Sequence, residues 1–455
     1  KRLPPDSVFN FQFIVDAFSS EEKKTPEKED TSTLKMNIDR ILVKKTRVIY
    51  KDLYSGNDMD LAIGRLDTKI ATFDPSHMHF NMPSIALKGL RGHFYQLVPL
   101  EKSVEKLVAE ASSKPENYLQ FENKEISLGD IDVVYKSEPS HINSSFVISH
   151  AEVHPKAIDL RNSVISLKDV LLDHSDIAIE TNSKLSDEKP KDTLSNKEDS
   201  SSMKIIADNI NLKNINLKYD DQSAPKALSG MDFSHLGIEN FSTNVANVQY
   251  GADTILASVK SLSFEEKSGF VLNNFTTDFY MIPTGVFLYN LLIRTPGTEL
   301  KPRLYATYPS LDAIKKDQGE LGLYIDLQQS KIAMKDVLTI MPQLKEQIPS
   351  ISPQSTIYVD AKITGKVSDL NLQKMRIRGL TATDINVNGT IRGLPDPKKI
   401  YADLRINQFQ SSRRDLMSLA PKNTLPKNIS IPRAFSAKGY VRGGMDNLST
   451  ELTLN

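Results

Sequence analysis

Two histidines near residue 78 are close enough in the sequence to suggest a metal site. His77 and His79, in the stretch HMH, lie two residues apart, so a β-strand would present both imidazoles on one face, as a metal site could use. No carboxylate-rich segment or further histidine cluster accompanies them, and the chain has no cysteine to add a thiolate ligand. We therefore interpret the two histidines as an incidental pair and predict no metal site.

Motifs that hold phosphate groups or activate a nucleophile are missing from the sequence. It contains no G-x-x-x-x-G-K-[ST] loop, no G-x-G-x-x-G turn and no G-x-S-x-G elbow. The stretch GLRG at 89–92 is better explained as a corner in a strand than as a phosphate-binding loop. Aromatic residues are sparse and tryptophan is absent, so stacking on bases or sugars is not suggested. We predict no catalytic residues, no cofactor and a function that is not enzymatic.

Charge and length narrow the class of protein further. Lys and Arg total 57 and Asp and Glu total 57, with the two signs interleaved, so no net field attracts nucleic acid. The 455 residues could form two to four ordinary domains or one long repetitive body. The most apolar segment, at 281–293, contains Pro, Gly and Asn and is too short to span a membrane. The chain opens without a signal peptide and ends inside an alternating stretch, which we interpret as a fragment of a longer protein.

The elements that would position any functional residue are mostly β-strands. Apolar and polar residues alternate most clearly in FNFQFIVDAF (9–18), ISLGDIDVVY (126–135), INLKNINLKY (210–219), STIYVDAKITGKV (355–367), TDINVNGTIRG (383–393) and IYADLRINQF (400–409). Helical patterns are limited to 99–111, 335–350 and 412–421. Residues 19–33 and 182–202 are too polar to pack, and we predict disordered loops there. The sequence thus predicts a mainly β protein with a few short helices.

One six-residue phrase recurs through the N-terminal half of the chain. Its copies are ILVKKT at Ile41, IALKGL at Ile85, ISLGDI at Ile126, ISLKDV at Ile165 and INLKNI at Ile210, with starts 44, 41, 39 and 45 residues apart. A longer step is set by Tyr50, Tyr135 and Tyr219, which are separated by 85 and 84 residues. Self-similarity at a constant step is typical of arrays in which each unit covers the face of its neighbour. An ordinary β-sandwich with chance matches is the alternative, and the regular steps favour a true repeat.

The apolar positions change parity inside this phrase. In the copy at Ile210 they are 210 and 212 before the change, and 215, 217 and 219 after it. A strand that skipped one residue would turn its apolar side chains to the opposite face, unless a bulge or a sharp corner bends the chain. Asp, Asn and Gly, which occur at these positions, tolerate the backbone angles that such corners need. We predict strand corners near residues 44–45, 129–130 and 213–214.

The C-terminal third carries repeats of its own. An alternating phrase recurs as ITGKVSDL at Ile363, VNGTIRGL at Val387 and AKGYVRGG at Ala437, and DVLTIMP (336–342) returns as DLMSLAP (415–421), 79 residues later. We therefore divide the chain into N-terminal β-groove repeats (1–181), a disordered loop (182–202), middle repeats (203–334) and C-terminal repeats with short helices (335–455).

These phrases resemble those of the AsmA-like/TamB family of Gram-negative envelope proteins. The resemblance rests on INLKNINLKYDD, INVNGTIRGLPDPKKIYADLRINQF, RDLMSLAP and FSAKGYVRGGMDNLSTELTLN, and it runs over most of the chain. It implies a long, twisted antiparallel β-sheet rolled into an open groove with an apolar interior, as in bridge-like lipid transfer proteins. It also implies an inner-membrane anchor helix outside this segment, a periplasmic location and phospholipid transport towards the outer membrane. A further implied partner is an Omp85-type outer-membrane barrel.

The predicted lining of the groove follows the alternating residues of the repeated phrases. These residues are Ile41, Val43, Ile85, Leu87, Ile126, Leu128, Ile165, Leu167, Ile210, Leu212, Ile385 and Val387. Their apolar face needs a cover, and a lipid acyl chain could supply it, since few helices are available to do so. Two alternatives stay open: a scaffold whose sheet edge assists the assembly of outer-membrane proteins by β-augmentation, and an adhesin with a closed, filled β-solenoid core.

Overall fold

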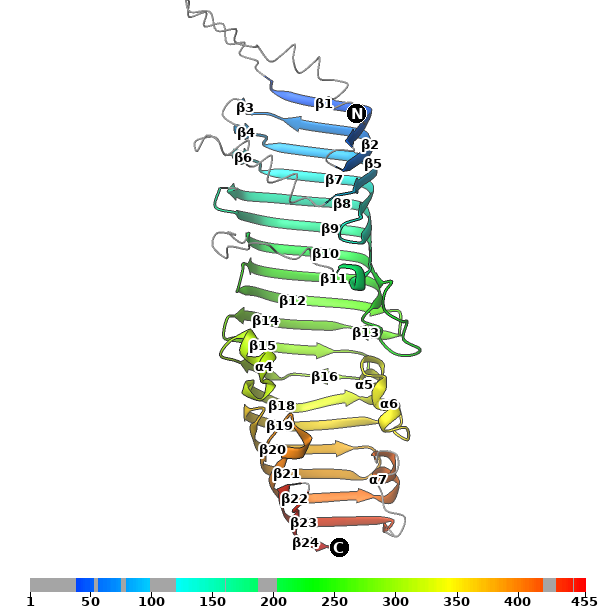
Figure 1. Ribbon diagram of the computed structural model, residues 1–455, viewed down its shortest axis with the longest axis vertical. Helices are drawn as coiled ribbons and strands as arrows, with labels where there is room; N and C mark the ends of the chain where they lie inside the picture. Colours follow the sequence, from blue (N-terminus) through cyan, green and yellow to red (C-terminus); the bar gives the residue numbers. More distant parts are fainter. Residues whose placement is uncertain are drawn as a thin grey trace, which may run out of the picture. The chain divides into compact units, whose positions relative to one another are not determined.

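The computed structural model describes residues 38–52, 56–74, 79–98, 120–159, 161–186, 203–419, 431–444 and 446–455. The chain divides into two compact units, Lys1–Pro225 (unit 1) and Lys226–Asn455 (unit 2). In each unit the long strands lie side by side as neighbouring strands of a sheet (Figure 1). The predicted boundary at 202/203 falls inside unit 1 and the one at 334/335 falls inside unit 2.

The described residues of unit 1 include seven long strands in one sheet. In sheet order they are β1 (Arg40–Asp52), β2 (Asn57–Lys69), β5 (Ser84–Gln96), β7 (Glu125–Ser137), β8 (Ile142–Asp159), β9 (Val164–Thr181) and β10 (Lys204–Asp221). A small second sheet is formed by β3 (Thr72–Asp74), β4 (His79–Asn81) and β6 (Gln120–Glu122), and α3 (Ser183–Ser186) follows β9. The pairs β5–β7 and β9–β10 are parallel, and the other pairs of the long strands are antiparallel.

Unit 2 continues the chain as an antiparallel meander. Its strands are β11 (His235–Tyr250), β12 (Ile255–Glu266), β13 (Phe270–Leu272), β14 (Asn274–Ile282), β15 (Gly285–Arg294), β16 (Glu299–Leu300), β17 (Arg303–Thr307), β18 (Gly322–Ala333), β19 (Thr356–Lys366), β20 (Asp369–Gly379), β21 (Thr383–Arg392), β22 (Tyr401–Ser412), β23 (Ala434–Gly444) and β24 (Ser449–Leu454). Short helices join them: α4 (Leu311–Lys316), η1 (Gln318–Glu320), α5 (Met334–Ile340), α6 (Gln343–Gln347), η2 (Pro397–Lys399) and α7 (Arg413–Leu419).

The predicted fold class is confirmed, because the described chain is mainly β with a few short helices. Most pairs of long strands are antiparallel, and two parallel pairs in unit 1 make the sheet mixed. Helices predicted at 335–350 and 412–421 are present as α5, α6 and α7. The predicted helix at 99–111, the strand at 9–18 and the loop at 19–33 lie outside the described residues, as does most of 182–202.

The predicted corners are present in the backbone. Lys45, Asp130 and Asn214 have φ angles of 48°, 51° and 52°, in the left-handed region. Gly89 and His174 extend the same row, with φ of 70° and 46°. His174 lies opposite Asn214, because the register pairs Asp173 with Lys213 and Ser175 with Ile215. Five of the seven long strands of unit 1 (β1, β5, β7, β9 and β10) thus have a left-handed residue in this row, which bends the sheet along a line and keeps the apolar side chains on one face.

Few of the described apolar side chains are fully buried in a core. The one cluster of buried apolar residues joins Met334 and Leu338 of α5 to Ile351.

The repeated motifs around α5 and α7 also share a polar contact. The Asp336 carboxylate accepts hydrogen bonds from the hydroxyls of Thr295 and Thr298, and that of Asp415 accepts them from the amides of Thr381 and Ala382 and the hydroxyl of Thr383. Each aspartate thus ties its helix to a turn of the sheet.

Candidate functional site

The two faces of the bent sheet differ in exposure, which identifies the inside of the bend. The residue directly after a corner is almost fully buried: Ile131 is 6% exposed, Ser175 2% and Ile215 1%. The next residues along β7 and β10, Asp132 and Asn216, are exposed. Side chains on the concave side of a bend crowd together, so we call the face that carries Ile131 and Ile215 the inner face and the opposite one the outer face.

Before the corner, the inner face of unit 1 carries two continuous apolar rows. The row nearest the corner runs through Val43, Leu66, Leu87, Leu128, Ala151, Leu172 and Leu212. The second row runs through Ile41, Thr68, Ile85, Ile126, Val153, Val170 and Ile210. Thr68 is the one polar member of the two rows. Eight of the predicted lining residues therefore share one face and two rows.

Ile165 and Leu167 lie outside these two rows. Both lie on β9, but they pair with Ile205 and Ala207, not with Ile210 and Leu212. The partners of Ile210 and Leu212 are Val170 and Leu172, five residues further along β9. With 170 in place of 165, the four steps become 44, 41, 44 and 40 residues, which is more regular than the sequence phrase suggested.

Beyond the corner, the apolar inner face continues for two more rows. Val48, Leu61, Gly92, Val133, Phe146, Ile177 and Leu217 form one, and Tyr50, Met59, Phe94, Tyr135, Ser144, Ile179 and Tyr219 form the next. The three tyrosines that recur in the sequence thus occupy one row, which confirms the longer repeat. The rings of Phe94 and Tyr135 stack there with centroids 5.9 Å apart.

A polar row closes this end of the inner face, and the sequence analysis missed it. Asp52, Gln96, Ser137 and Asp221 are all nearly buried. The Tyr135 hydroxyl donates to the Gln96 side chain at 2.7 Å. Hydrogen bonds from the side chains and amides of Ser183 and Ser223 hold the pKa of Asp221 well below its usual range. A single polar residue at the end of a strand does not stand out in the alternating pattern of the sequence. Only the register of the strands shows that these residues lie in one row.

In unit 2 the same pattern of corner and inner face recurs. Gln329 and Asn290 have φ of 45° and 53°, and the residues after them, Ser330 and Leu291, are 1% and 5% exposed. Ile385 and Val387 of β21 lie on the inner face. Their rows run through Val359, Ile377, Ile385 and Phe409, and through Leu327, Ala361, Met375, Val387 and Ile406.

A third row in unit 2 contains a glycine that the sheet requires. It runs through Ile325, Ile363, Leu372, Gly389, Leu404 and Val441. Gly389 has φ of 142°, and a Cβ built on it would lie 2.1 Å from the carbonyl oxygen of Asp403 on the next strand. This glycine belongs to the repeated phrase VNGTIRGL, so close strand approach explains its place in that phrase.

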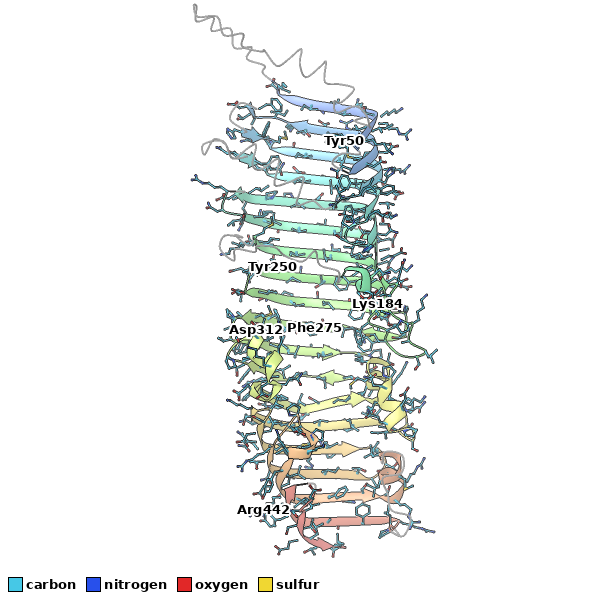
Figure 2. All side chains as sticks on the ribbon, viewed as in Figure 1. Tyr50, Lys184, Tyr250, Phe275, Asp312 and Arg442 are labelled. Atoms are coloured by element: carbon cyan, nitrogen blue, oxygen red, sulfur yellow. The ribbon has the colours of Figure 1, made fainter. Side chains whose placement is uncertain are left out.

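The inner face is only partly covered. All twelve predicted lining residues are half-buried, and none is in the buried core. Among the described residues of unit 1, each long strand makes its extensive contacts with its neighbours in the sheet, and β8 also contacts β6. No second layer of described strands or helices packs over the rows of unit 1, whereas in unit 2 Met334 and Leu338 of α5 pack against Ile357 of β19. Figure 2 shows side chains projecting from both sides of the strands.

The remaining observations concern the histidine pair, metal binding and membrane-spanning helices. His79 lies 3.2 Å from a Glu122 carboxylate oxygen, and His77 lies outside the described residues. Within the described ranges, no group of three or more His, Asp or Glu side chains is placed to hold a metal ion. None of the helices described is both long enough and apolar enough to cross a membrane.

Comparison with known proteins finds no match. The chain matches no family model, no curated protein and no solved structure.

Proposed function

We propose that this chain is a non-enzymatic conduit that carries phospholipid along the inner face of its bent sheet. The observation that supports this proposal is the continuity of the apolar rows: the row from Val43 to Leu212 crosses seven neighbouring strands without a polar side chain. No second protein layer packs over it among the described residues. Such a face is costly in water unless something apolar covers it.

An acyl chain fits this requirement energetically. Exposing a chain of about 16 carbons to water costs on the order of 12 kcal/mol, at about 0.8 kcal/mol per methylene. A surface that stays apolar from strand to strand lowers that cost at every position, so a lipid could move along it without chemistry in this segment. The charged outer face, with ion pairs such as Arg47–Asp60 at 2.6 Å, keeps the sheet soluble.

The resemblance of the repeated phrases to the AsmA-like/TamB family supplies the cellular setting of the proposal. We propose a periplasmic location in a Gram-negative bacterium, an inner-membrane anchor outside this segment, and transfer between the inner and outer membranes in support of outer-membrane biogenesis. An Omp85-type barrel and other envelope proteins are the proposed protein partners.

A photo-crosslinker on the inner face tests the proposal directly. With the crosslinking residue at Leu128 or Leu212, native mass spectrometry and lipid analysis of the purified protein should detect bound phospholipid, and irradiation should link it. The matched control places the crosslinker at Ser127 or Asn211, on the outer face of the same strands, where no lipid should be captured. Absence of phospholipid at both inner positions would overturn the conduit, and capture of an unfolded outer-membrane protein along β1 or β24 would favour the scaffold.

A further inference from the structure

Unit 2 carries a row of aromatic side chains on its outer face. Tyr280, Phe287, Tyr305 and Tyr324 are successive register partners on β14, β15, β17 and β18, and Tyr289 lies beside Phe287 on β15. Their chain neighbours Phe279, Leu288, Leu304 and Ile325 form the adjacent inner-face row. Since successive residues of a strand point to opposite faces, the aromatic row lies on the side that is otherwise polar. We call these five residues the aromatic ladder.

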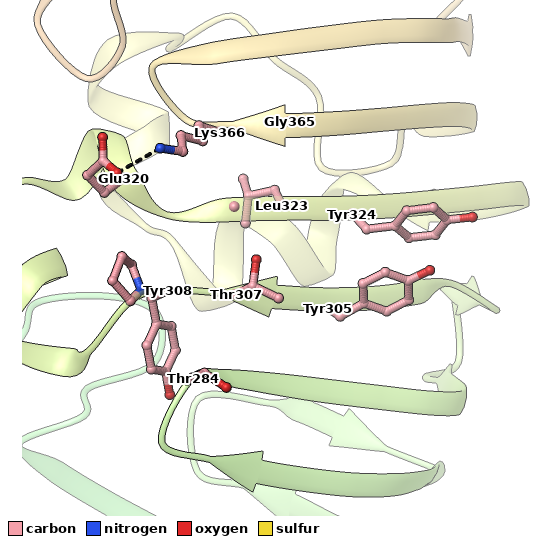
Figure 3. A pocket seen from close by; sticks show the side chains of 11 residues that line it. Thr284, Tyr305, Thr307, Tyr308, Glu320, Leu323, Tyr324, Gly365 and Lys366 are labelled. Carbon is pink, nitrogen blue, oxygen red and sulfur yellow. Dashed lines mark hydrogen bonds and ion pairs between the residues drawn. The ribbon is translucent and has the colours of Figure 1, made fainter.

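The rings of the ladder contact one another and remain accessible. Tyr305 and Tyr324 stack with centroids 4.2 Å apart, and their hydroxyls point the same way (Figure 3). Tyr289 lies 6.2 Å from Tyr305 and 5.7 Å from Tyr280. Tyr280 is 40% exposed and Tyr289 is 44% exposed. Cross-strand stacking accounts for the Tyr305–Tyr324 pair, but it does not require the exposed rings of Tyr280 and Tyr289 beside that pair.

Two hollows flank the ladder and share Tyr305. One, of about 680 Å³, is lined by Tyr305 and Tyr324 together with Tyr308, Glu320 and Lys366. The other, of about 470 Å³, is lined by Tyr280, Tyr289, Asn290, Asp278, Arg303 and Tyr305. Aromatic walls combined with a few fixed polar groups are typical of ligand sites.

The polar groups of the hollows favour a neutral ligand that both donates and accepts hydrogen bonds. Asp278 and Glu320 balance Arg303 and Lys366 in charge, and Lys366 lies 2.8 Å from Glu320. Asp278 is held in place by hydrogen bonds from Ser258 at 2.7 Å and Asn290 at 2.8 Å. Arg303 also lines the second hollow, and its guanidinium supplies hydrogen-bond donors there.

We propose that the aromatic ladder and its two hollows bind an oligosaccharide. A sugar ring presents apolar C–H faces to aromatic rings and hydroxyls to carboxylates, amides and guanidinium groups, which matches this lining. A peptide added as an extra strand is excluded here, because β14, β15, β17 and β18 are paired on both sides and offer no free edge. The site lies on the face opposite the apolar rows and is independent of lipid binding.

Ligand-observed saturation-transfer NMR tests the proposal. The probes are tetrasaccharides of β-1,4-linked glucose or N-acetylglucosamine, added at millimolar concentration to the whole chain. We expect transfer to the ring C–H protons of at least one probe, and a loss of affinity of tenfold or more in Tyr289→Leu and Tyr324→Leu. A leucine side chain still packs against the neighbouring rings, but it has no aromatic face on which a sugar ring could stack. Tyr358→Leu, at a 44% exposed tyrosine of β19 outside the ladder, is the matched control and should bind normally.

A further variant separates binding from folding. Arg303→Gln changes a side chain that packs in neither ring stack, so it should leave the melting temperature unchanged and still weaken binding several-fold. The proposal is overturned if neither tetrasaccharide receives saturation, if the ladder variants bind as well as the Tyr358→Leu control, or if the ladder binds a proline-rich peptide in place of the sugars.

Discussion

At the scale of single residues, a substitution at Leu212 distinguishes an open inner face from a closed one. It is half-buried in the row of apolar residues nearest the corner. On an open face, Leu212→Asp keeps access to water, so we expect a loss of stability of about 1–2 kcal/mol together with loss of bound phospholipid. The control Asn211→Asp puts the same charge on the outer face and should change neither. Thermal melting with lipid analysis makes the measurement, and complete unfolding of Leu212→Asp would instead indicate a closed core.

A second residue-scale prediction concerns the corner at Asn214. Its φ of 52° suits glycine and asparagine, whereas a β-branched side chain is strained there. Denaturant unfolding should show Asn214→Gly within about 0.5 kcal/mol of the parent and Asn214→Val destabilised by about 1–2 kcal/mol. Lys218→Val, at an exposed position of the same strand, is the control and should have little effect. Equal stability of the two valine variants would contradict the corner.

At the scale of elements, Asp415 fastens α7 to the turn at Thr381–Thr383. Burial alone would raise the pKa of Asp415, but hydrogen bonds from the Ala382 amide, the Thr383 hydroxyl and the Thr381 amide outweigh it and lower the pKa. We expect Asp415→Ala to lower the free energy of unfolding by about 2–3 kcal/mol, because three donors lose their acceptor. The half-buried Asp403, paired with Arg442 at 2.6 Å, serves as the control, and Asp403→Ala should cost less than about 1 kcal/mol.

The same carboxylate gives unit 2 a dependence on pH with a defined sign. Its pKa in the folded state is lower than the value of about 4 in an unfolded chain, so folding favours the ionised form. The contribution is complete above the unfolded pKa and is lost as the pH falls through the folded pKa. Urea unfolding between pH 6 and pH 2 (roughly the range that spans both pKa values) should show a shallower acid-side decrease in Asp415→Ala than in the parent. Parallel pH profiles for the two proteins would refute this role.

At the scale of the whole molecule, the single-layer construction of each unit leads to a prediction for solution scattering. Each unit is built mainly as one layer of strands, and a single layer encloses less volume per residue than a globular core does. A compact chain of this length would have a radius of gyration of about 22–23 Å. Small-angle X-ray scattering should give a clearly larger value, and a value near the compact one would contradict the architecture.

The sequence by itself determined the elements and where they bend. Alternation and parity are local properties of side chains, so they predicted the strands, the corners at Lys45, Asp130 and Asn214, and the short helices α5 to α7. The steps between Tyr50, Tyr135 and Tyr219 also predicted a longer repeat, and the structure places the three tyrosines in one row. Eight of the lining residues of unit 1, from Ile41 to Leu212, were placed on one face for the same reason.

Tertiary structure alone decided which strands pair, in which direction and at which register. Alternation looks the same in either direction of a strand, so the parallel pairs β5–β7 and β9–β10 were not predicted. Register depends on hydrogen bonding between strands, and it pairs Ile210 and Leu212 with Val170 and Leu172, outside the repeated phrase that begins at Ile165. The aromatic ladder arises in the same way: residues spread from Tyr280 to Tyr324 meet only because four paired strands place them side by side.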